Sequence, residues 1–169
     1  MSAYFSERLR PDHDLSGFSS GRDALDHWLK DAALQADRSG TGRTYVLVDR
    51  SHHVVAYFTL APHLVRRSDV PKAAAHGAPD AIPSILLARL AVAESLHGRG
   101  LGGIVLAHAL EVALEGMRKA GGRLIVVDAI DADAASFYAH HGFVAVPGNP
   151  HRLMMKASAA ARSLSLRWP

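Results

Sequence analysis

The 169-residue sequence contains no cysteine, only four lysines among its 19 basic residues, and no run of about 20 apolar residues. Without cysteine there is neither a disulfide framework nor a thiolate metal site, as is usual in a reducing compartment, so we expect a cytoplasmic protein. Residues 1–14 have no apolar core of a signal peptide, and no membrane span is expected.

Hydrophobic residues make up 49% of the chain, enough for the core of one domain, and the formal net charge is +3. Arginine supplies 15 of the 19 basic side chains, and its planar guanidinium suits bidentate binding of phosphate. A high-GC codon bias favours arginine equally well, so the charge does not decide between the two explanations.

Hydrophobic periodicity predicts a mixed α/β (α+β) fold with strands and helices in an irregular order. Pro62 is expected to end the second of two paired strands, and residues 63–83, which contain three prolines, are expected to form a loop. We predict one domain over residues 1–156 and a frayed tail over 157–169. The expected strands are 3–9, 44–48, 54–60, 85–92, 124–127, 143–146 and 153–155, and the expected helices are 21–36 (N-capped by Ser19 or Ser20), 104–117 and 132–140.

Four glycines fall within residues 98–103, between the apolar strand 85–92 and the helix that follows. Glycines at the start of a helix let an anion approach unpaired main-chain amides, so this stretch is a candidate phosphate-binding loop. One interpretation is a dinucleotide fingerprint, with Gly98, Gly100 and Gly103 in the G-x-G-x-x-G pattern and Asp128 as the ribose ligand. A second is a purely structural turn. A triphosphate-binding P-loop is excluded because no Lys-Ser/Thr pair follows the last glycine.

A third interpretation comes from two motifs. His97-Gly98-Arg99-Gly100-Leu101-Gly102 resembles the Q/R-x-x-G-x-G/A loop of the GCN5-related N-acetyltransferases (GNAT), with His97 replacing Gln or Arg. AASFYAHHGF, at residues 134–143, resembles the A-x-x-F-Y-x-x-x-G-F signature of the same superfamily. PSILLARLAVAESLHGRGLGG (83–103), FSSGRDALDHWL (18–29) and VVAYFTLAP (54–62) are similar to segments of acetyltransferase toxins from bacterial type II toxin–antitoxin systems.

The resemblance implies the GNAT fold, a mixed, mostly antiparallel sheet of six or seven strands flanked by about four helices. It implies acetyl-CoA as donor and Tyr138 as the catalytic acid. It further implies a homodimer, aminoacyl-tRNA as substrate, and a ribbon-helix-helix antitoxin that gives the complex its only contact with DNA. The donor-binding residues it implies are Leu90, Ala91, Val92, His97, Gly98, Arg99, Gly100, Leu101, Gly102 and Gly103.

The residue chemistry agrees with this assignment. A tyrosine has a pKa of about 10, so Tyr138 is protonated at neutral pH and can donate a proton. No carboxylate stands out as a base, although Glu94 is a possibility. Without a base, the acceptor must already be neutral in part at pH 7. This favours an α-amine, with a pKa near 8, over a lysine side chain, with a pKa near 10.4.

Arginines are the candidates to contact tRNA phosphates. Arg89 interrupts an apolar strand, so it should face a cleft or form a buried pair; Arg22 and Arg43 are the other selected positions. Arg8, Arg10, Arg38, Arg66 and Arg67 complete the set. No metal site is expected, since the two adjacent His pairs lack a ligand-like spacing.

Two alternative functions stay open. One is a GNAT enzyme that acetylates a small amine or a protein N-terminus, and the other is a non-catalytic module that binds CoA or a nucleotide.

Overall fold

The computed structural model describes residues 3–169. In this range the strand order of the sheet is β1-β2-β3-β4-β5-β7-β6, with seven strands. Pairing is antiparallel for β1–β2, β2–β3, β5–β7 and β6–β7, and parallel for β4–β5. The prediction of a mixed, mostly antiparallel sheet is therefore confirmed.

The strands are β1 (Phe5–Arg8), β2 (Arg43–Val48), β3 (Val54–Arg66), β4 (Ala81–Val92), β5 (Leu124–Asp128), β6 (Val144–Val146) and β7 (Asn149–Lys156). The α-helices are α1 (Asp23–Asp31), α2 (Ala33–Ser39), α3 (Lys72–Ala75), α4 (Leu101–Ala120), α5 (Ala132–His140) and α6 (Ala157–Ser163). Short 3₁₀ turns occupy Arg67–Asp69 and Glu94–Leu96. Across residues 3–169 this is more helices than the four expected.

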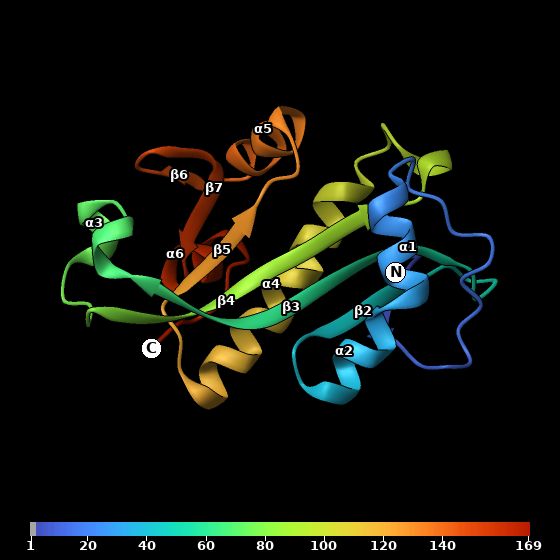
Figure 1. Cartoon of the computed structure of the whole chain (residues 1–169), viewed down its shortest axis with the longest axis horizontal. Helices are drawn as coiled ribbons and strands as arrows, with labels where there is room; N and C mark the ends of the chain where they lie inside the picture. Colours follow the sequence, from blue (N-terminus) through green and yellow to red (C-terminus); the bar gives the residue numbers. More distant parts are fainter. Residues whose placement is uncertain (1–2) are drawn as a thin grey trace. The chain divides into compact units, whose positions relative to one another are not determined.

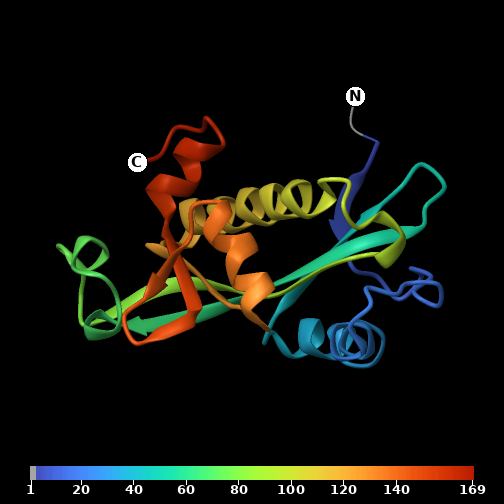
Figure 2. The same ribbon diagram turned by 90° about the horizontal axis from the view of Figure 1, so that it is seen from above.

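Two compact units make up the chain: residues 1–61 with 88–109, and residues 62–87 with 110–169. In the first unit, α1 and α2 lie on one face of β2 and β3, and the first half of α4 lies on the other (Figures 1 and 2). Its apolar core joins side chains from the sheet and from α1 and α2: Leu9, Phe18, Leu29, Ala33, Val46, Val48, Val54, Tyr57 and Ala91.

In the second unit, α5 and α6 both pack against β7. Its core takes residues from the ends of β3 and β4, from α3 and from the hairpin β6–β7: Val65, Val70, Ala74, Ala78, Ile82, Leu124, Val126, Val146 and Met154. The alternation of these positions along β5 and β7 puts Val126 and Met154 opposite each other on one face of the sheet.

Three sequence predictions differ from the structure. Residues 63–66 and 81–84 continue β3 and β4, so the loop expected over 63–83 is shorter, and Pro62 does not end its strand. The register of β3 with β2 ends at Leu60, so Pro62 lies where no hydrogen bond to β2 is needed, a position that tolerates proline. Residues expected to fray instead form α6, in which Ala157, Ala160 and Ala161 are buried.

The N-terminal helix is also corrected. It is interrupted at Ala32 and begins at Asp23, without a side-chain cap from Ser19 or Ser20. The Ser20 hydroxyl instead donates to the Asp26 carboxylate at 2.6 Å, and the Ser20 amide donates to the same group at 3.0 Å. Ser20 therefore binds the segment before α1 to Asp26, in the first turn of that helix.

Candidate active site

The glycine loop of the first unit connects β4 to α4. Gly98 and Gly100 have φ values of +76° and +75°, a left-handed conformation that other residues adopt only with strain. A Cβ at either position would meet nothing within 4 Å, so the conformation, and not a lack of space, requires glycine there. Gly102 and Gly103 belong to the first turn of α4, which starts three residues earlier than predicted.

The side chain of His97 anchors this loop. Its Nε2 donates to the main-chain carbonyl of Val92, at the end of β4, over 2.9 Å. The amides of Leu96 and His97 are used in the preceding turn, whereas in the described chain the amides of Gly98, Arg99 and Gly100 have no main-chain acceptor. Free amides followed by the N-terminus of a 20-residue helix form an arrangement suited to an anion.

The three strand residues predicted to bind the donor lie in the last part of β4. Ala91 and Val92 are buried and Leu90 is half-buried. Ala91 belongs to the core of the first unit, so its side chain packs and only its main chain is available to a ligand. The Val92 carbonyl already accepts the His97 bond, which leaves one fewer free main-chain acceptor for a ligand.

Tyr138, the predicted acid, lies on α5 in the second unit. Asp131 caps this helix by accepting a bond from the Ala134 amide at 2.8 Å, and the helix spans the residues that the sequence predicted. The Tyr138 ring makes edge contacts with Phe137 and Phe143, at centroid distances of 5.2 and 5.6 Å. Its side chain is buried, and this desolvation raises the pKa of the phenol above its ordinary value. Within residues 3–169 its hydroxyl has no hydrogen-bond partner. The phenol is therefore protonated, and its hydroxyl can donate a hydrogen bond or a proton to a ligand.

Arg89 was expected to face a cleft or to form a buried pair. Its guanidinium lies over the Trp28 ring, 3.9 Å from the centroid, and Trp28 in turn stacks with Tyr57 at 6.4 Å. Desolvation is the main cause that lowers the pKa of Arg89. Arg89 is half-buried, and its partner is an aromatic ring of the first unit, so the contact is a cation–π interaction. The hydrophobic pattern of the strand did not predict this kind of contact.

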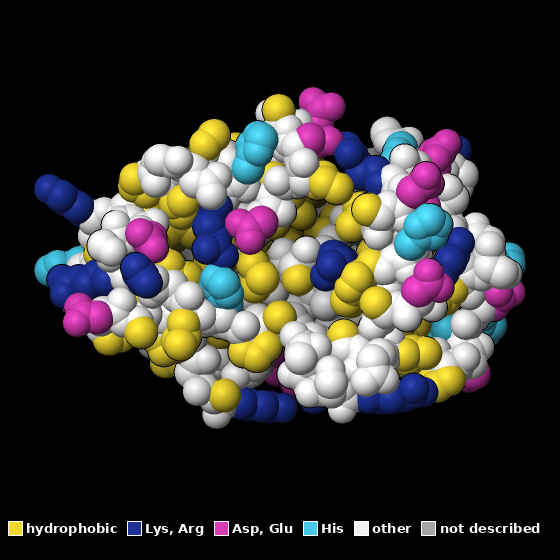
Figure 3. Space-filling model, in the orientation of Figure 1, with side chains coloured by type: hydrophobic (Ala, Val, Ile, Leu, Met, Phe, Trp, Pro, Cys, Tyr) yellow, Lys and Arg dark blue, Asp and Glu magenta, His cyan; other side chains and the backbone are white. Residues whose placement is uncertain are grey.

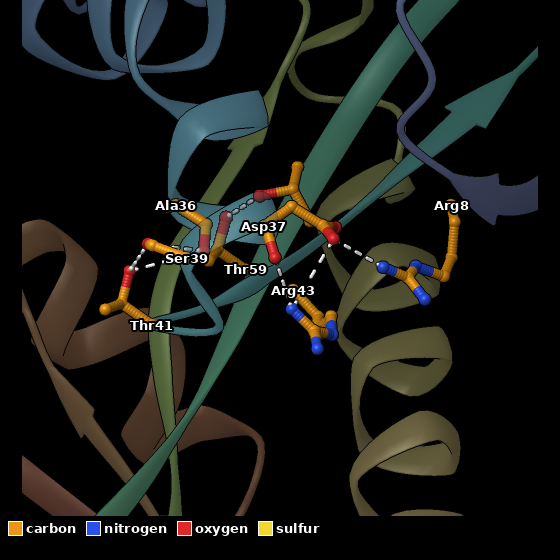
Figure 4. A network of polar contacts seen from close by, with 8 residues as sticks. Arg8, Ala36, Asp37, Ser39, Thr41, Arg43 and Thr59 are labelled. Carbon is orange, nitrogen blue, oxygen red and sulfur yellow. Dashed lines mark hydrogen bonds and ion pairs between the residues drawn. The ribbon is translucent and has the colours of Figure 1, made fainter.

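Arg43 belongs to an ion-pair network with Arg8 and Asp37 (Figure 4). The carboxylate Oδ1 of Asp37 lies 2.5 Å from Arg8 Nη2 and 3.4 Å from Arg43 Nη1. Arg43 also donates to the main-chain carbonyl of Asp37 at 2.6 Å. These contacts hold α2 against β1 and β2. Arg22, the third selected arginine, is exposed immediately before α1.

A basic basin in the second unit involves two further candidate arginines. Arg66, Arg67, Lys72 and His76 line an open cavity of about 810 Å³ around α3. Figure 3 shows Lys and Arg side chains gathered over α3. Arg123 supports the wall by donating to the carbonyls of His76 and Gly77, at 2.9 and 3.1 Å.

Glu94 is exposed, and its main-chain amide donates to the Ser19 carbonyl at 2.7 Å. A Cβ on Gly21 would come within 2.8 Å of its carboxylate, so the loop before α1 passes close to this group. No cluster of three or more potential metal ligands occurs among residues 3–169. No helix in that range is long and apolar enough to cross a bilayer.

One polar cluster was missed by the sequence analysis. Asp128, at the end of β5, pairs with Arg152 of β7 at 3.0 Å, and Arg152 Nη2 donates to His63 Nε2 of β3 at 2.6 Å. Desolvation, together with the Arg152 charge, lowers the pKa of His63, so the imidazole is neutral and accepts this bond. The three residues are far apart in sequence, and only strand pairing brings them together.

Comparison with known proteins identifies the class. The acetyltransferase (GNAT) domain matches residues 40–145, and the chain belongs to this family of acyl-transferring enzymes. Membership of this family replaces the dinucleotide interpretation, and Asp128, the ribose ligand expected there, pairs with Arg152 instead.

Three individual relatives are similar to this chain over nearly its whole length. A Mycobacterium tuberculosis protein named "tRNA-acetylating toxin" is 36% identical over 156 residues, which cover 92% of this chain and 93% of the relative. The KacT toxin variant has a TM-score of 0.89 at 24% identity, covering 96% of this chain and 99% of its own, and it supports the fold.

AtaT is the third relative. Its complex with acetyl-methionyl-tRNAfMet has a TM-score of 0.85 at 29% identity and covers 96% of this chain and 97% of AtaT. A variant of AtaT is known bound to the C-terminus of the antitoxin AtaR and acetyl-CoA, with a TM-score of 0.82, 27% identity, and 97% and 99% coverage. AtaT and AtaR also form a complex with DNA.

Proposed function

We propose that this chain is an acetyl-CoA-dependent N-acetyltransferase that acetylates the α-amine of aminoacyl-tRNA and so blocks translation. The observation that carries the proposal is the 36% identity to the tRNA-acetylating toxin over 92% of the chain. The functional residues fall within one acetyltransferase domain over residues 1–156, with α6 and the last residues as a C-terminal extension. Acetylation removes the nucleophile needed for the next peptide bond, which explains why such an activity arrests growth.

The first unit supplies the donor subsite. The free amides of Gly98, Arg99 and Gly100, with those of Leu101, Gly102 and Gly103 in the first turn of α4, receive the pyrophosphate of acetyl-CoA. Because these groups are main-chain donors at a helix N-terminus, they bind two phosphates without needing a lysine. His97 holds the loop in place through Val92. The main chain of Leu90, Ala91 and Val92 runs beside the pantetheine arm.

Tyr138 supplies the proton. The neutral amine attacks the thioester carbonyl, its nitrogen loses one proton to solvent, the carbon–sulfur bond breaks, and the phenol protonates the departing thiolate. A main-chain amide at or next to Leu90 stabilises the developing oxyanion. Burial keeps the phenol protonated well above neutral pH, and the absence of a hydroxyl partner within residues 3–169 leaves it free for this transfer.

The acceptor is an α-amine. Glu94 is exposed, and within residues 3–169 its carboxylate makes no hydrogen bond or ion pair that would orient it as a base. The enzyme therefore relies on the neutral fraction of its acceptor. At pH 7 an α-amine with a pKa near 8 has a neutral fraction of about one tenth, whereas a lysine amine has less than about a thousandth. An acceptor of this kind is what an aminoacyl-tRNA offers. Arg22, Arg43 and Arg89 were selected for tRNA contact; Arg22 and Arg43 are exposed, and we propose both as phosphate contacts.

The proposed partners follow from the same relatives. The proposal includes a cognate ribbon-helix-helix antitoxin, DNA contacted only through that complex, a homodimer, and action in the cytoplasm. It includes no metal ion in catalysis.

The test is acetyl transfer to defined acceptors. Purified protein is incubated with acetyl-CoA and a pool of charged tRNA, and the nuclease digest is analysed by mass spectrometry for acetyl-aminoacyl adenosine. Parallel reactions contain a lysine peptide, a free amino acid or a peptide N-terminus. We expect acetylation of charged tRNA only. Transfer to a free amine or a peptide N-terminus, with none to tRNA, would select the general acetyltransferase, and acetyl-CoA binding without any transfer would select the non-catalytic module.

A further inference from the structure

A small cavity in the second unit opens beside the polar cluster of His63, Arg152 and Asp128. Its volume is about 210 Å³. Apolar and polar residues both line it. The apolar ones are Val65, Val70, Val126, Val146, Pro147 and Met154, and the others are Asp69, Gly148, Asn149 and Arg152.

The cavity and the cluster occupy consecutive positions on the same face of three strands. His63 is followed two residues later by Val65 on β3. Asp128 and Arg152 are opposite each other in the β5–β7 register, and so are Val126 and Met154. Since residues two apart in a strand share a face, the polar set lies directly above the apolar set. Arg152 belongs to both sets, because it also lines the cavity.

The charges beside the cavity are incompletely paired. Arg152 Nε lies 3.0 Å from an Asp128 oxygen, but it is buried and makes no aligned hydrogen bond, so the contact is an ion pair only. The Asp128 side chain is 59% exposed, which leaves carboxylate oxygen open to a second cation. The neutral His63 holds the other side of the guanidinium.

We infer that this constellation is the acceptor subsite, in which the cavity takes the apolar side chain of the aminoacyl group and the Asp128 carboxylate accepts a hydrogen bond from its neutral α-amine. The inference rests on the proposed function. An apolar cavity of about 150 Å³ suffices to bind benzene, so this one accommodates a side chain as large as methionine or leucine. Asp128 ends β5 and Asp131 caps the helix that carries Tyr138, so the amine subsite and the acid follow the same strand end. The carboxyl end of a strand in a parallel pair is a common place for ligands.

The pocket is tested with one tRNA body charged in turn with glycine, alanine, methionine or phenylalanine. Wild-type protein is expected to show a kcat/KM for methionine about tenfold or more above that for glycine. Val146→Phe fills the cavity from the edge strand β6. It should lower the ratio of the kcat/KM for methionine to that for glycine to about one. Val144→Phe adds the same volume on the same strand at a side chain that is 56% exposed and does not line the cavity, so it is the matched control.

Asp128→Asn provides a second variant that does not depend on core packing, because the residue is exposed. It should raise the KM for charged tRNA about tenfold while leaving the KM for acetyl-CoA unchanged. Loss of the side-chain preference equally in both valine variants would overturn the inference, as would an unchanged preference in Val146→Phe together with an unchanged KM in Asp128→Asn. Failure of the wild-type protein to acetylate any charged tRNA would instead refute the proposed function, and the inference with it.

Discussion

Two tyrosines of this protein are both buried, yet their hydroxyl groups are used differently. The Tyr57 hydroxyl donates to the Leu25 carbonyl at 2.7 Å, and its ring packs against Phe18 and Trp28. Tyr138 has similar ring contacts, but within residues 3–169 its hydroxyl has no partner. Burial raises the pKa of both phenols. Within residues 3–169 the Tyr138 oxygen is not among the buried atoms that lack a partner, so it is accessible at the surface although its ring is buried. An accessible hydroxyl without a protein partner is the feature that separates a candidate catalytic group from a structural one.

The largest expected effect is on catalysis. Tyr138→Phe removes the proton donor and retains the ring, so we expect acetyl transfer to fall by about 10²–10⁴-fold while acetyl-CoA affinity is kept. Single-turnover rates with charged tRNA and calorimetric titration with acetyl-CoA measure the two quantities. Tyr57→Phe is the matched control. Equal rates in the two variants would remove the distinction between the tyrosines.

The next effect is on stability. Tyr57→Phe leaves the Leu25 carbonyl without its donor, and we expect unfolding to become easier by about 1–2 kcal/mol. Tyr138→Phe loses no hydrogen bond within the described chain, so its free energy of unfolding should stay within about 0.5 kcal/mol of wild type. Urea denaturation followed by circular dichroism measures both, and a larger loss in Tyr138→Phe than in Tyr57→Phe would contradict the comparison.

The smallest expected effect is a loss of stability at alkaline pH, to which Tyr57 and Tyr138 both contribute. Their folded pKa values lie above the unfolded value of about 10, so the folded state keeps protons that the unfolded state loses. Stability from this source is fully present below pH 10 and is lost as the pH rises from there towards the folded pKa values. The wild-type melting temperature should therefore fall above pH 10, and the double variant Tyr57→Phe/Tyr138→Phe should fall less steeply. Parallel curves would mean that neither phenol is shifted.

Local signals were sufficient for the parts of the site that lie in one segment. The helix predicted over 132–140 coincides with α5, and the glycine pattern located the loop before α4, although that helix begins at Leu101 instead of 104. Prolines misled the prediction of strand ends, because Pro62 is tolerated where the register with β2 has finished. Alanine-rich residues 157–163 carry little periodicity, and their helix follows from the packing of Ala157, Ala160 and Ala161.

Contacts between distant segments could not be predicted. His63 and Arg152 are 89 positions apart, and nothing local in either stretch indicates their bond. The role of Arg43 was likewise hidden, since its partner Asp37 lies on α2 and its selection rested on charge alone. Arg89 was recognised as unusual, but its Trp28 partner comes from α1, about 60 positions earlier in the chain.

The glycine loop has a consequence for genetics. Its donors belong to the peptide backbone, so replacing Arg99 or Leu101 by another side chain leaves the same N–H groups in place. Cells that survive expression of this enzyme should therefore carry inactivating changes concentrated at Gly98, Gly100 and Tyr138, with Arg99 largely silent. A catalogue of such escape mutants would map the donor site without a ligand, a crystal or an assay.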